Sequence, residues 1–412
     1  MTWPTTRMGE HFRVKHGYAF KGEYFDSEGQ YVLLTPGSFI EEGGYREQGK
    51  KTKFYTGDIP ESYVLDEGDL LVAMTEQTPG LLGSSAWIPE SGRLLHNQRL
   101  GRIVDLDEHR LSKRFLYYLF NTKEVRDQIS ATATGGKVRH TAPERIAQVL
   151  FRRPPLGTQQ SIAAALSAYD DLIENNRRRM ALLEEAARHL YCEWFVRLRF
   201  PGHEHTRITN GVPEGWARRS FVQTCSSLED GDWIETKDQG GEDYRLLQIS
   251  NIGVNEFIET GNLRYVTEET FKRLNCREIL SEHVLIARMP DPIGRAWLVT
   301  DMPWRMITAV DVAIAIANEG VADAYFLTYF LNSPTTLEQC KRLAVGATRP
   351  RIARRELASL PLLLPQHQLQ LHFREYVEPL HKQRAVLHRQ IEKLRTARNL
   401  LLPRLMNGAI SV

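Results

Sequence analysis

The sequence predicts an α+β chain with a pseudo-twofold internal duplication, in which two similar globular domains are separated by two long antiparallel coiled-coil helices. Three observations predict this fold. Similar segments recur at a nearly constant offset across the 412 residues. The first part of each copy has the residue pattern of short strands and loops, and each copy ends in a heptad pattern of apolar residues.

The internal repeat rests on five pairs of segments that follow one another in the same order, 210 to 214 residues apart. They are 31–34 with 244–247, 69–74 with 283–288, 86–88 with 296–298, 115–122 with 326–333, and Gly135 or Gly136 with Gly346. This period is too long for a solenoid. It indicates two copies of one unit, each about half of the chain.

The first part of each copy reads as a mixed domain. Segments 69–74 and 283–289 are short apolar runs bounded by glycine, proline or charged residues, and 310–317 alternates around β-forming residues. Such runs predict buried strands. Segments 115–130 and 325–337 have the pattern of amphipathic helices, so we expect α+β domains with many irregular loops.

The second part of the first copy predicts one long helix. Its seam alternates steps of four and three residues, which is the heptad pattern of a coiled coil. The seam consists of Ile162, Leu166, Tyr169, Ile173, Asn176, Met180, Leu183, Ala187, Leu190 and Trp194.

A second long helix closes the second copy. Apolar residues recur there every seven positions, at Phe373, Leu380, Leu387, Leu394 and Leu401, with Leu369, Tyr376, Gln383, Gln390 and Ala397 in the intervening slots. Pro379 lacks an N–H donor and predicts a kink or break near Tyr376. A helix of about 40 residues spans about 60 Å. We expect the two helices to pair with each other, with Asn176 and Gln383 setting the register; a dimerisation stalk is the alternative.

These patterns predict four parts in chain order: globular domains at 1–153 and 201–355, and long helices at 154–200 and 356–412.

Composition excludes several classes of protein. A net charge of +2, from 53 basic and 51 acidic residues, excludes a polycationic DNA-coating protein and a disordered polyelectrolyte, but a basic face can still exist. The four cysteines form no CxxC pair, so we expect neither a zinc ribbon nor disulfides, and a cytoplasmic location. We expect neither a signal peptide at 1–12 nor a membrane span.

Enzyme motifs are also missing. The sequence contains no Asn-Pro-Pro-aromatic motif of an adenine methyltransferase and no GxGxxG that opens a helix. Gly136-Lys137 is followed by Val138, so it is not a phosphate-binding P-loop. His203 and His205 lack further metal ligands at suitable spacing, so no metal site is expected.

The two helical regions resemble those of the DNA-specificity subunits of Type I restriction–modification systems. The first region carries 159–163 and 166–174 after Pro154-Pro155-Leu156, and ends with 183–191 and 193–195. The second carries 394–395, 397–398 and the closing segment 401–408. Family members often have Asp where this chain has Asn399, which puts a salt bridge at that position in doubt.

The resemblance implies a function and partners. Each globular domain would be a target recognition domain that reads one half of a bipartite sequence in double-stranded DNA. The helices would set the separation and dock the methyltransferase (modification) subunits, two in number, with restriction or translocase subunits joining through them. The chain itself would have no catalytic site and no cofactor, and S-adenosylmethionine and ATP would belong to the partner subunits.

Basic and amide side chains in glycine-containing loops are the candidates for DNA contact, because such groups bind phosphates and base edges. Loops 135–141 and 346–351 share glycine and basic residues at equivalent positions, and segment 15–21 interleaves basic and aromatic residues. The candidates are Lys15, Lys21, Asn97, Gln98, Arg99, Lys137, Arg139, Arg288, Arg295, Arg349 and Arg351. Each of these could instead belong to an ordinary structural turn.

Two other functions stay open at this point. One is a coiled-coil scaffold with two ligand-binding domains and no DNA specificity, which the absence of an adjacent methyltransferase gene would favour. The other is an unrecognised nuclease, suggested by Met289-Pro290-Asp291, although no acidic-x-Lys motif follows. Metal-dependent DNA cleavage by the purified chain would favour it.

Overall fold

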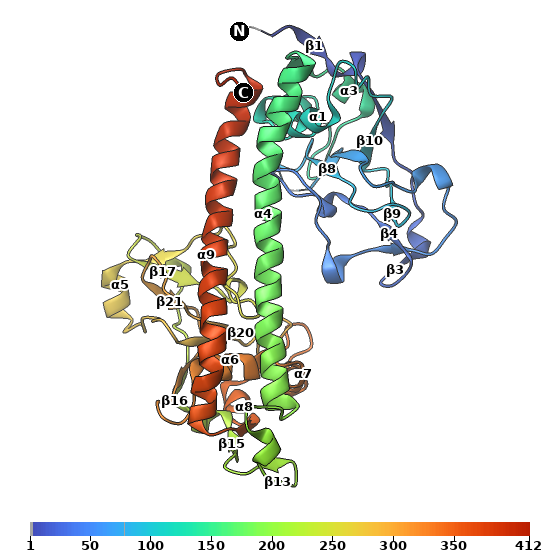
Figure 1. The fold of residues 1–412 in the computed structure, drawn as a ribbon. Helices are drawn as coiled ribbons and strands as arrows, with labels where there is room; N and C mark the ends of the chain where they lie inside the picture. Colours follow the sequence, from blue (N-terminus) through green and yellow to red (C-terminus); the bar gives the residue numbers. More distant parts are fainter. Residues whose placement is uncertain (1–2, 78) are drawn as a thin grey trace. The chain divides into compact units, whose positions relative to one another are not determined.

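The computed structural model describes residues 3–77 and 79–412 (Figure 1). Two compact units are present: unit 1 comprises Met1–Asn176 and Arg389–Val412, and unit 2 comprises Arg177–His388. Helices α4 (Leu156–Tyr191) and α9 (His367–Met406) each contribute residues to both units. Among the described residues no helix has the length and apolarity needed to cross a membrane. The four-part division in chain order stays a prediction, because these units follow spatial contacts.

Unit 1 is built around a four-stranded antiparallel sheet. Its order is β2 (Arg13–His16), β10 (Leu100–Val104), β6 (Leu70–Ala73) and β8 (Ser85–Trp87). A second sheet has the order β3 (Phe25–Asp26), β5 (Phe54–Tyr55), β4 (Tyr31–Leu33) and β9 (Leu94–Leu95), and β4 and β9 are parallel. Two short ladders join β1 (Thr5–Arg7) to β12 (Leu150–Arg152) and β7 (Thr75–Glu76) to β11 (Arg139–His140). The helices are α1 (Lys113–Phe120), α2 (Lys123–Ala131) and α3 (Pro143–Ala147).

Unit 2 repeats this plan. Its four-stranded sheet has the order β16 (Cys225–Asp230), β22 (Val312–Ala317), β19 (Val284–Ala287) and β20 (Ala296–Leu298). A second sheet joins β18 (Tyr265–Val266), β17 (Tyr244–Leu247) and the parallel strand β21 (Met306–Thr308). Strand β15 (Ala217–Ser220) pairs with β23 (Pro361–Leu364), and β13 (Ile208–Thr209) with β14 (Val212–Pro213). The helices are α5 (Glu268–Arg273), α6 (Ala324–Leu331), α7 (Pro334–Leu343) and α8 (Arg354–Ala358). The shared strand order confirms the α+β class and the duplication.

Strand pairing corrects one part of the repeat alignment. Leu71 pairs with Ala86 on β8, whereas its counterpart Leu285 pairs with Trp297 on β20. Ala86 therefore corresponds to Trp297, and the match of Ala86-Trp87 with Ala296-Trp297 is one residue out. The alignment matched the two Ala-Trp pairs by residue identity alone. The strand pairing excludes this match, because a one-residue shift would turn every side chain of the strand to the opposite face.

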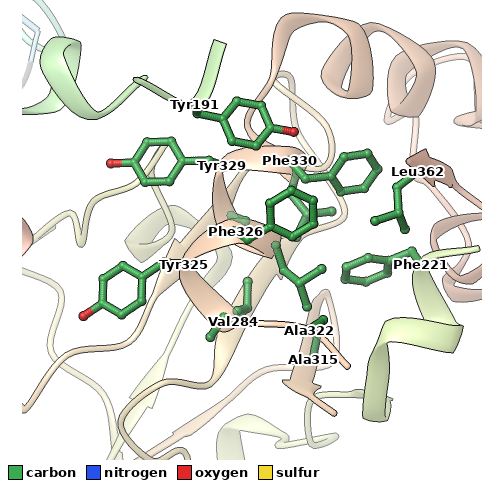
Figure 2. Packing of buried hydrophobic residues seen from close by; sticks show 14 of the residues in the cluster. Tyr191, Phe221, Val284, Ala315, Ala322, Tyr325, Phe326, Tyr329, Phe330 and Leu362 are labelled. Carbon is green, nitrogen blue, oxygen red and sulfur yellow. The ribbon is translucent and has the colours of Figure 1, made fainter. Parts of the chain in front are cut away.

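The four-stranded sheet is buried on both faces, which explains why its strands β6 and β19 are apolar at every position. In unit 1, Leu70 and Val72 contact a cluster that contains α1, while Leu71 and Ala73 face the cluster under the second sheet. In unit 2 the equivalent helix-side core includes Val284, below the aromatic rings of Tyr325, Phe326, Tyr329 and Phe330 from α6 (Figure 2).

Each predicted amphipathic helix is in fact two helices. The break falls at Asn121-Thr122 between α1 and α2, and at Asn332-Ser333 between α6 and α7. Thr122 and Ser333 are the N-caps of the second helix in each pair, and their side chains accept hydrogen bonds from its first turn. Because an N-cap residue has a non-helical backbone, the first helix ends before it. The amide oxygens of Asn121 and Asn332 accept hydrogen bonds from the N–H groups of Ser85 and Ala296, at 3.1 and 2.8 Å.

The predicted seam lies on the packed face of α4, apart from Trp194, which lies in the short π-helix Cys192–Val196 that follows α4. Ile162, Leu166, Ile173, Asn176, Ala187 and Trp194 are buried, and Tyr169, Met180, Leu183 and Leu190 are half-buried. In unit 1, Ile162 and Leu166 share a core with Leu405 and Met406 of α9. In unit 2, Ala187 and Trp194 share a core with Phe373 and Val377 of α9.

The seam of α9 differs from its prediction in every second position. Phe373 and Leu387 are buried, and Leu380, Leu394 and Leu401 are half-buried. The intervening packed positions are 370, 377, 384, 391 and 398, one residue beyond the predicted slots, and Tyr376 and Gln383 are exposed. Two of the true positions hold Arg384 and Arg398, and these charges hide the apolar period.

Those arginines form ion pairs with α4, and the pairs fix an antiparallel arrangement within each unit. In unit 1, Arg398 pairs with Asp170, and Asn176 donates to Gln390 at 3.4 Å. In unit 2, Arg384 pairs with Glu184, so the predicted register role of Gln383 is replaced by its neighbour. The break predicted near Tyr376 is wrong, since α9 is continuous through Pro379, and the kink given as its alternative stays a prediction.

Candidate nucleic-acid interface

Three segments singled out in the first copy converge on one edge of unit 1. A chain of backbone hydrogen bonds joins them: Gln98 N–H donates to Tyr18 O at 2.9 Å, Met74 N–H to Arg99 O at 3.0 Å, and Thr141 N–H to Met74 O at 2.9 Å. Segments 15–21, 97–99 and 134–141 therefore lie side by side, with 74–76 between the last two. We call these four segments the unit 1 edge.

A tight hairpin forms the outer part of this edge. Thr134 and His140 exchange two backbone hydrogen bonds of 2.9 and 2.8 Å, and the turn between them contains Gly135 at φ 108°. A Cβ on Gly135 would lie only 2.1 Å from the carbonyl oxygen of Val138. Glycine is therefore required here for both backbone conformation and space, and Lys137 is carried at the exposed tip.

Unit 2 has the same edge in its backbone. Asp232 N–H donates to Thr308 O at 2.8 Å, as Tyr18 N–H donates to His96 O at 2.9 Å in unit 1. Arg288 takes the place of Met74: its N–H donates to Asp311 O, and its carbonyl accepts from Ile352 N–H, both at 3.1 Å. The unit 2 edge therefore comprises 229–235, 309–311, 288–290 and 345–352.

The second hairpin matches the first in detail. Val345 and Arg351 exchange two backbone hydrogen bonds of 3.0 Å around Gly346, whose φ is 126°. A Cβ on Gly346 would lie 2.9 Å from the carbonyl oxygen of Arg349, three residues later as in unit 1. Arg349 is exposed at this tip, where Lys137 and Val138 lie in the other unit.

The candidate residues of unit 1 separate into exposed and anchored side chains. Lys21, Gln98, Arg99 and Lys137 are exposed. Asn97 is buried, and its Oδ1 accepts from Arg99 N–H, so it shapes the turn.

Two basic residues of the same edge are held by neighbours. Lys15 donates to Ser62 O at 2.7 Å and lies 4.3 Å from the centre of the Tyr63 ring. Arg139 pairs with the buried Glu76 at 3.2 Å and donates to Ser130 at the end of α2. Arg139 therefore fixes the base of the hairpin while Lys137 projects from its tip.

Arg288 and Arg295 correct the prediction for unit 2, because both side chains are used inside the fold. Arg295 is 7% exposed and donates to four backbone carbonyls, those of Ile249, Ile252, Pro290 and Pro292. Arg288 is 4% exposed, pairs with Asp230 at 3.1 Å and donates to Val310 O at 2.6 Å. Burial lowers the pKa of both guanidinium groups. They cannot reach base edges as these loops stand.

The unit 2 edge also exposes residues that were not among the candidates. Trp233 and Val345 are 71% and 80% exposed, which is unusual for large apolar side chains. Trp233 follows the Asp230-Gly231-Asp232 segment, at the place of Ala19 in unit 1. Extending the repeat alignment to segment 15–21 would have found it. Apolar and aromatic groups can contact thymine methyl groups or bases, so this edge offers different chemistry from that of unit 1.

Comparisons with known proteins agree on one family. The model of the Type I restriction modification DNA specificity domain matches residues 1–185. The Type I restriction enzyme MjaIX specificity subunit of Methanocaldococcus jannaschii is 22% identical over 325 residues, covering 77% of this chain and 73% of that protein. The EcoBI specificity subunit of Escherichia coli is 22% identical over 393 residues, covering 89% and 78%.

Similarity also extends over the full length. The MjaVIII specificity subunit of M. jannaschii is 21% identical over 420 residues, covering 100% of this chain and 93% of that protein. The crystal structure of a Type I restriction–modification S subunit from M. genitalium has the same fold, with a TM-score of 0.56 at 14% identity, covering 98% and 96%. The sequence matches and the shared fold agree with the resemblance that the helix motifs predict: residues 1–185 match the Type I restriction modification DNA specificity domain, and the whole chain is similar to Type I restriction–modification specificity subunits.

Proposed function

We propose that each unit reads one half of a bipartite DNA sequence, using the unit 1 edge and the unit 2 edge. The observation that carries this proposal is that the two edges share one backbone but differ in exposed side chains. Unit 1 offers Gln98, Arg99 and Lys137, whereas unit 2 offers Trp233 and Arg349. Arginine and glutamine suit guanine and adenine edges, and aromatic or apolar groups suit stacking and thymine methyl groups. Two edges with the same backbone but different exposed side chains could each read a different half-site.

In this proposal the chain performs no catalysis. Methyltransferase subunits would dock along α4 and α9 and carry the S-adenosylmethionine, while restriction subunits with their ATP would join through them. The spacer between the half-sites would depend on the helices, whose paired seams are long enough to act as a ruler.

Methylation mapping in the source cell is the direct test. We expect a bipartite motif with an unspecified spacer, and deletion of this gene should abolish that methylation. A continuous palindrome that depends on this gene would contradict the proposal.

Residue exchanges would then assign each half. Gln98→Ala and Lys137→Ala should relax one half of the motif only, while Arg349→Ala should affect the other half only. Glu28→Ala, an exposed change outside both edges, is the control. Relaxation of both halves by one variant would reject the assignment of one half to each unit.

The ruler role has a separate test. Seven residues inserted after Met180 of α4, with seven inserted after Leu387 of α9, keep both heptad patterns and add about 10 Å, or about three base pairs. The spacer in the methylated motif should lengthen accordingly. An unchanged spacer in a folded, methylating complex would reject this role.

A further inference from the structure

Unit 2 contains an arginine-lined pocket next to its edge. The pocket has a volume of about 550 Å³ and is lined by Asp230, Arg288, Val310, Val345, Arg351, Ala353, Arg354 and Arg355. Five of these residues, Asp230, Arg288, Val310, Val345 and Arg351, belong to the edge defined above, and Arg354 and Arg355 follow it on α8. The pocket is therefore continuous with the surface proposed to face DNA.

The charges of the pocket favour an anion. Arg288 and Arg354 share the single lining carboxylate, Asp230, at 3.1 and 3.8 Å. Arg351 and Arg355 pair with Asp311 and Glu356, each at 3.1 Å, but neither of these acids lines the pocket. Even when both are counted, four guanidinium groups face three carboxylates. The side chains of Arg354 and Arg355 remain 47% and 89% exposed, so they are available to a ligand.

Two hydrogen-bond donors in the pocket are also unused. The Nε groups of Arg288 and Arg351 are buried and have no hydrogen-bond partner among the described residues. Arg288 as a whole is 4% exposed, so its unpaired donor is a costly group to leave unsatisfied. The Oδ1 atom of Asp230 is also buried without a hydrogen-bond partner among the described residues. An oxyanion would therefore bind at the exposed guanidinium groups of Arg354 and Arg355, because arginine binds phosphate oxygens with charge-assisted hydrogen bonds.

Unit 1 does not repeat this arrangement. Backbone hydrogen bonds and the helices α3 and α8 set the equivalences, which put Met74, His140, Pro143 and Glu144 at the places of Arg288, Arg351, Arg354 and Arg355. The same backbone in unit 1 therefore has none of the four arginines. The pocket is a property of unit 2 and not of the common frame.

We propose that this pocket binds a backbone phosphate of duplex DNA and so anchors unit 2, but not unit 1, by an electrostatic contact beside its reading edge. This inference rests on the proposed function, because it takes the adjacent edge to face DNA. A phosphate contact positions a protein on the duplex without reading sequence, so it complements the readout by Trp233 and Arg349.

Salt dependence of DNA binding tests the pocket. The double variant Arg354→Gln/Arg355→Gln and the single variant Arg355→Gln would be compared with the wild-type chain, alone and co-purified with its methyltransferase subunits. The probe is a fluorescent 30-base-pair duplex of arbitrary sequence, titrated at several salt concentrations. Arg218→Gln/Arg219→Gln is the matched control, since it removes two adjacent exposed arginines of the same unit that lie outside the pocket.

Loss of one phosphate contact should reduce the slope of log K against log salt by about 0.9, which corresponds to about eightfold weaker binding at 0.1 M salt. The Arg355→Gln variant should show part of this change, and the control should keep the wild-type slope. Wild-type slopes in both pocket variants, with normal circular dichroism, would overturn the pocket alone. Absence of duplex binding by the wild-type chain in both forms would overturn the proposed function and the pocket with it.

Discussion

Two buried glutamines on the long helices give the sharpest test of how the helices are attached to the sheet-rich parts. Gln159 of α4 and Gln370 of α9 are both fully buried. The Gln370 side chain accepts from Asp323 N–H at 2.9 Å and donates to Val321 O and Pro365 O at 3.1 and 3.0 Å. Gln159 makes the same three bonds, to Ser112 N–H, Arg110 O and Pro154 O.

The perturbation is Gln370→Leu, which keeps the side-chain size and removes all three bonds. Each net hydrogen bond contributes about 1 kcal/mol, so the three together contribute about 3 kcal/mol. Leucine cannot replace them, and three backbone groups, two of them in buried hydrogen bonds, would lose this partner. At 1.4 kcal/mol per factor of ten, local opening of this region should become about 100-fold more frequent. Gln159→Leu should have the same effect in unit 1, because its bonds are the same.

Hydrogen exchange measured by mass spectrometry gives the readout. Peptides that contain Asp323 should exchange about 100-fold faster in Gln370→Leu, and those that contain Ser112 should do so in Gln159→Leu. The exposed neighbours supply matched controls, Gln368→Leu and Gln160→Leu, which remove no bond from the described structure. Exchange in the buried variants that stays within threefold of these controls would refute the reasoning.

Three further predictions concern the edges and the cores. Gly135→Ala and Gly346→Ala should weaken DNA binding, because each added Cβ meets a carbonyl oxygen and each backbone is at positive φ. Gly136→Ala is the control, because its Cβ would lie in open space, and it should bind normally in the same titration. Equal binding by all three variants would contradict the hairpin geometry. Arg295→Met should lower the free energy of unfolding of unit 2 by about 4 kcal/mol in urea denaturation, since four carbonyls lose a charged donor. Arg349→Met should change this free energy by less than about 0.5 kcal/mol. Similar losses in both variants would show that the four bonds of Arg295 do not stabilise unit 2. Burial lowers the pKa of His96 to about 4 and of His381 to about 3. Between these values and about 6.5 the unfolded chain binds more protons than the folded chain, so stability should fall as pH falls from 6.5, by up to about 1.4 kcal/mol per pH unit and histidine. His96→Gln and His381→Gln should flatten the pH profile measured by chemical denaturation, and unchanged slopes would argue against burial of the neutral rings.

Much of the fold could be predicted from the sequence because apolar residues recur with the periods of helices and strands, and because similar segments recur in the same order in both halves. The seam of α4, the apolar strands at 70–73 and 284–287, and the paired glycines at 135 and 346 all follow from residue type and spacing. The seam of α9 was harder, because Arg384 and Arg398 occupy core positions and pair there with carboxylates from α4. A charge in a seam cannot be distinguished from a surface charge without its partner.

The sequence by itself determined the two-copy plan, the class of the domains, the long helices and the resemblance to Type I specificity subunits. Only the tertiary structure decided which basic residues are free to meet DNA. Arg295 and Arg349 look alike in sequence, yet one is enclosed by four carbonyls and the other is exposed at a hairpin tip. The difference depends on strands and loops that come together from distant parts of the chain, and burial set by such contacts is not a property of any local pattern.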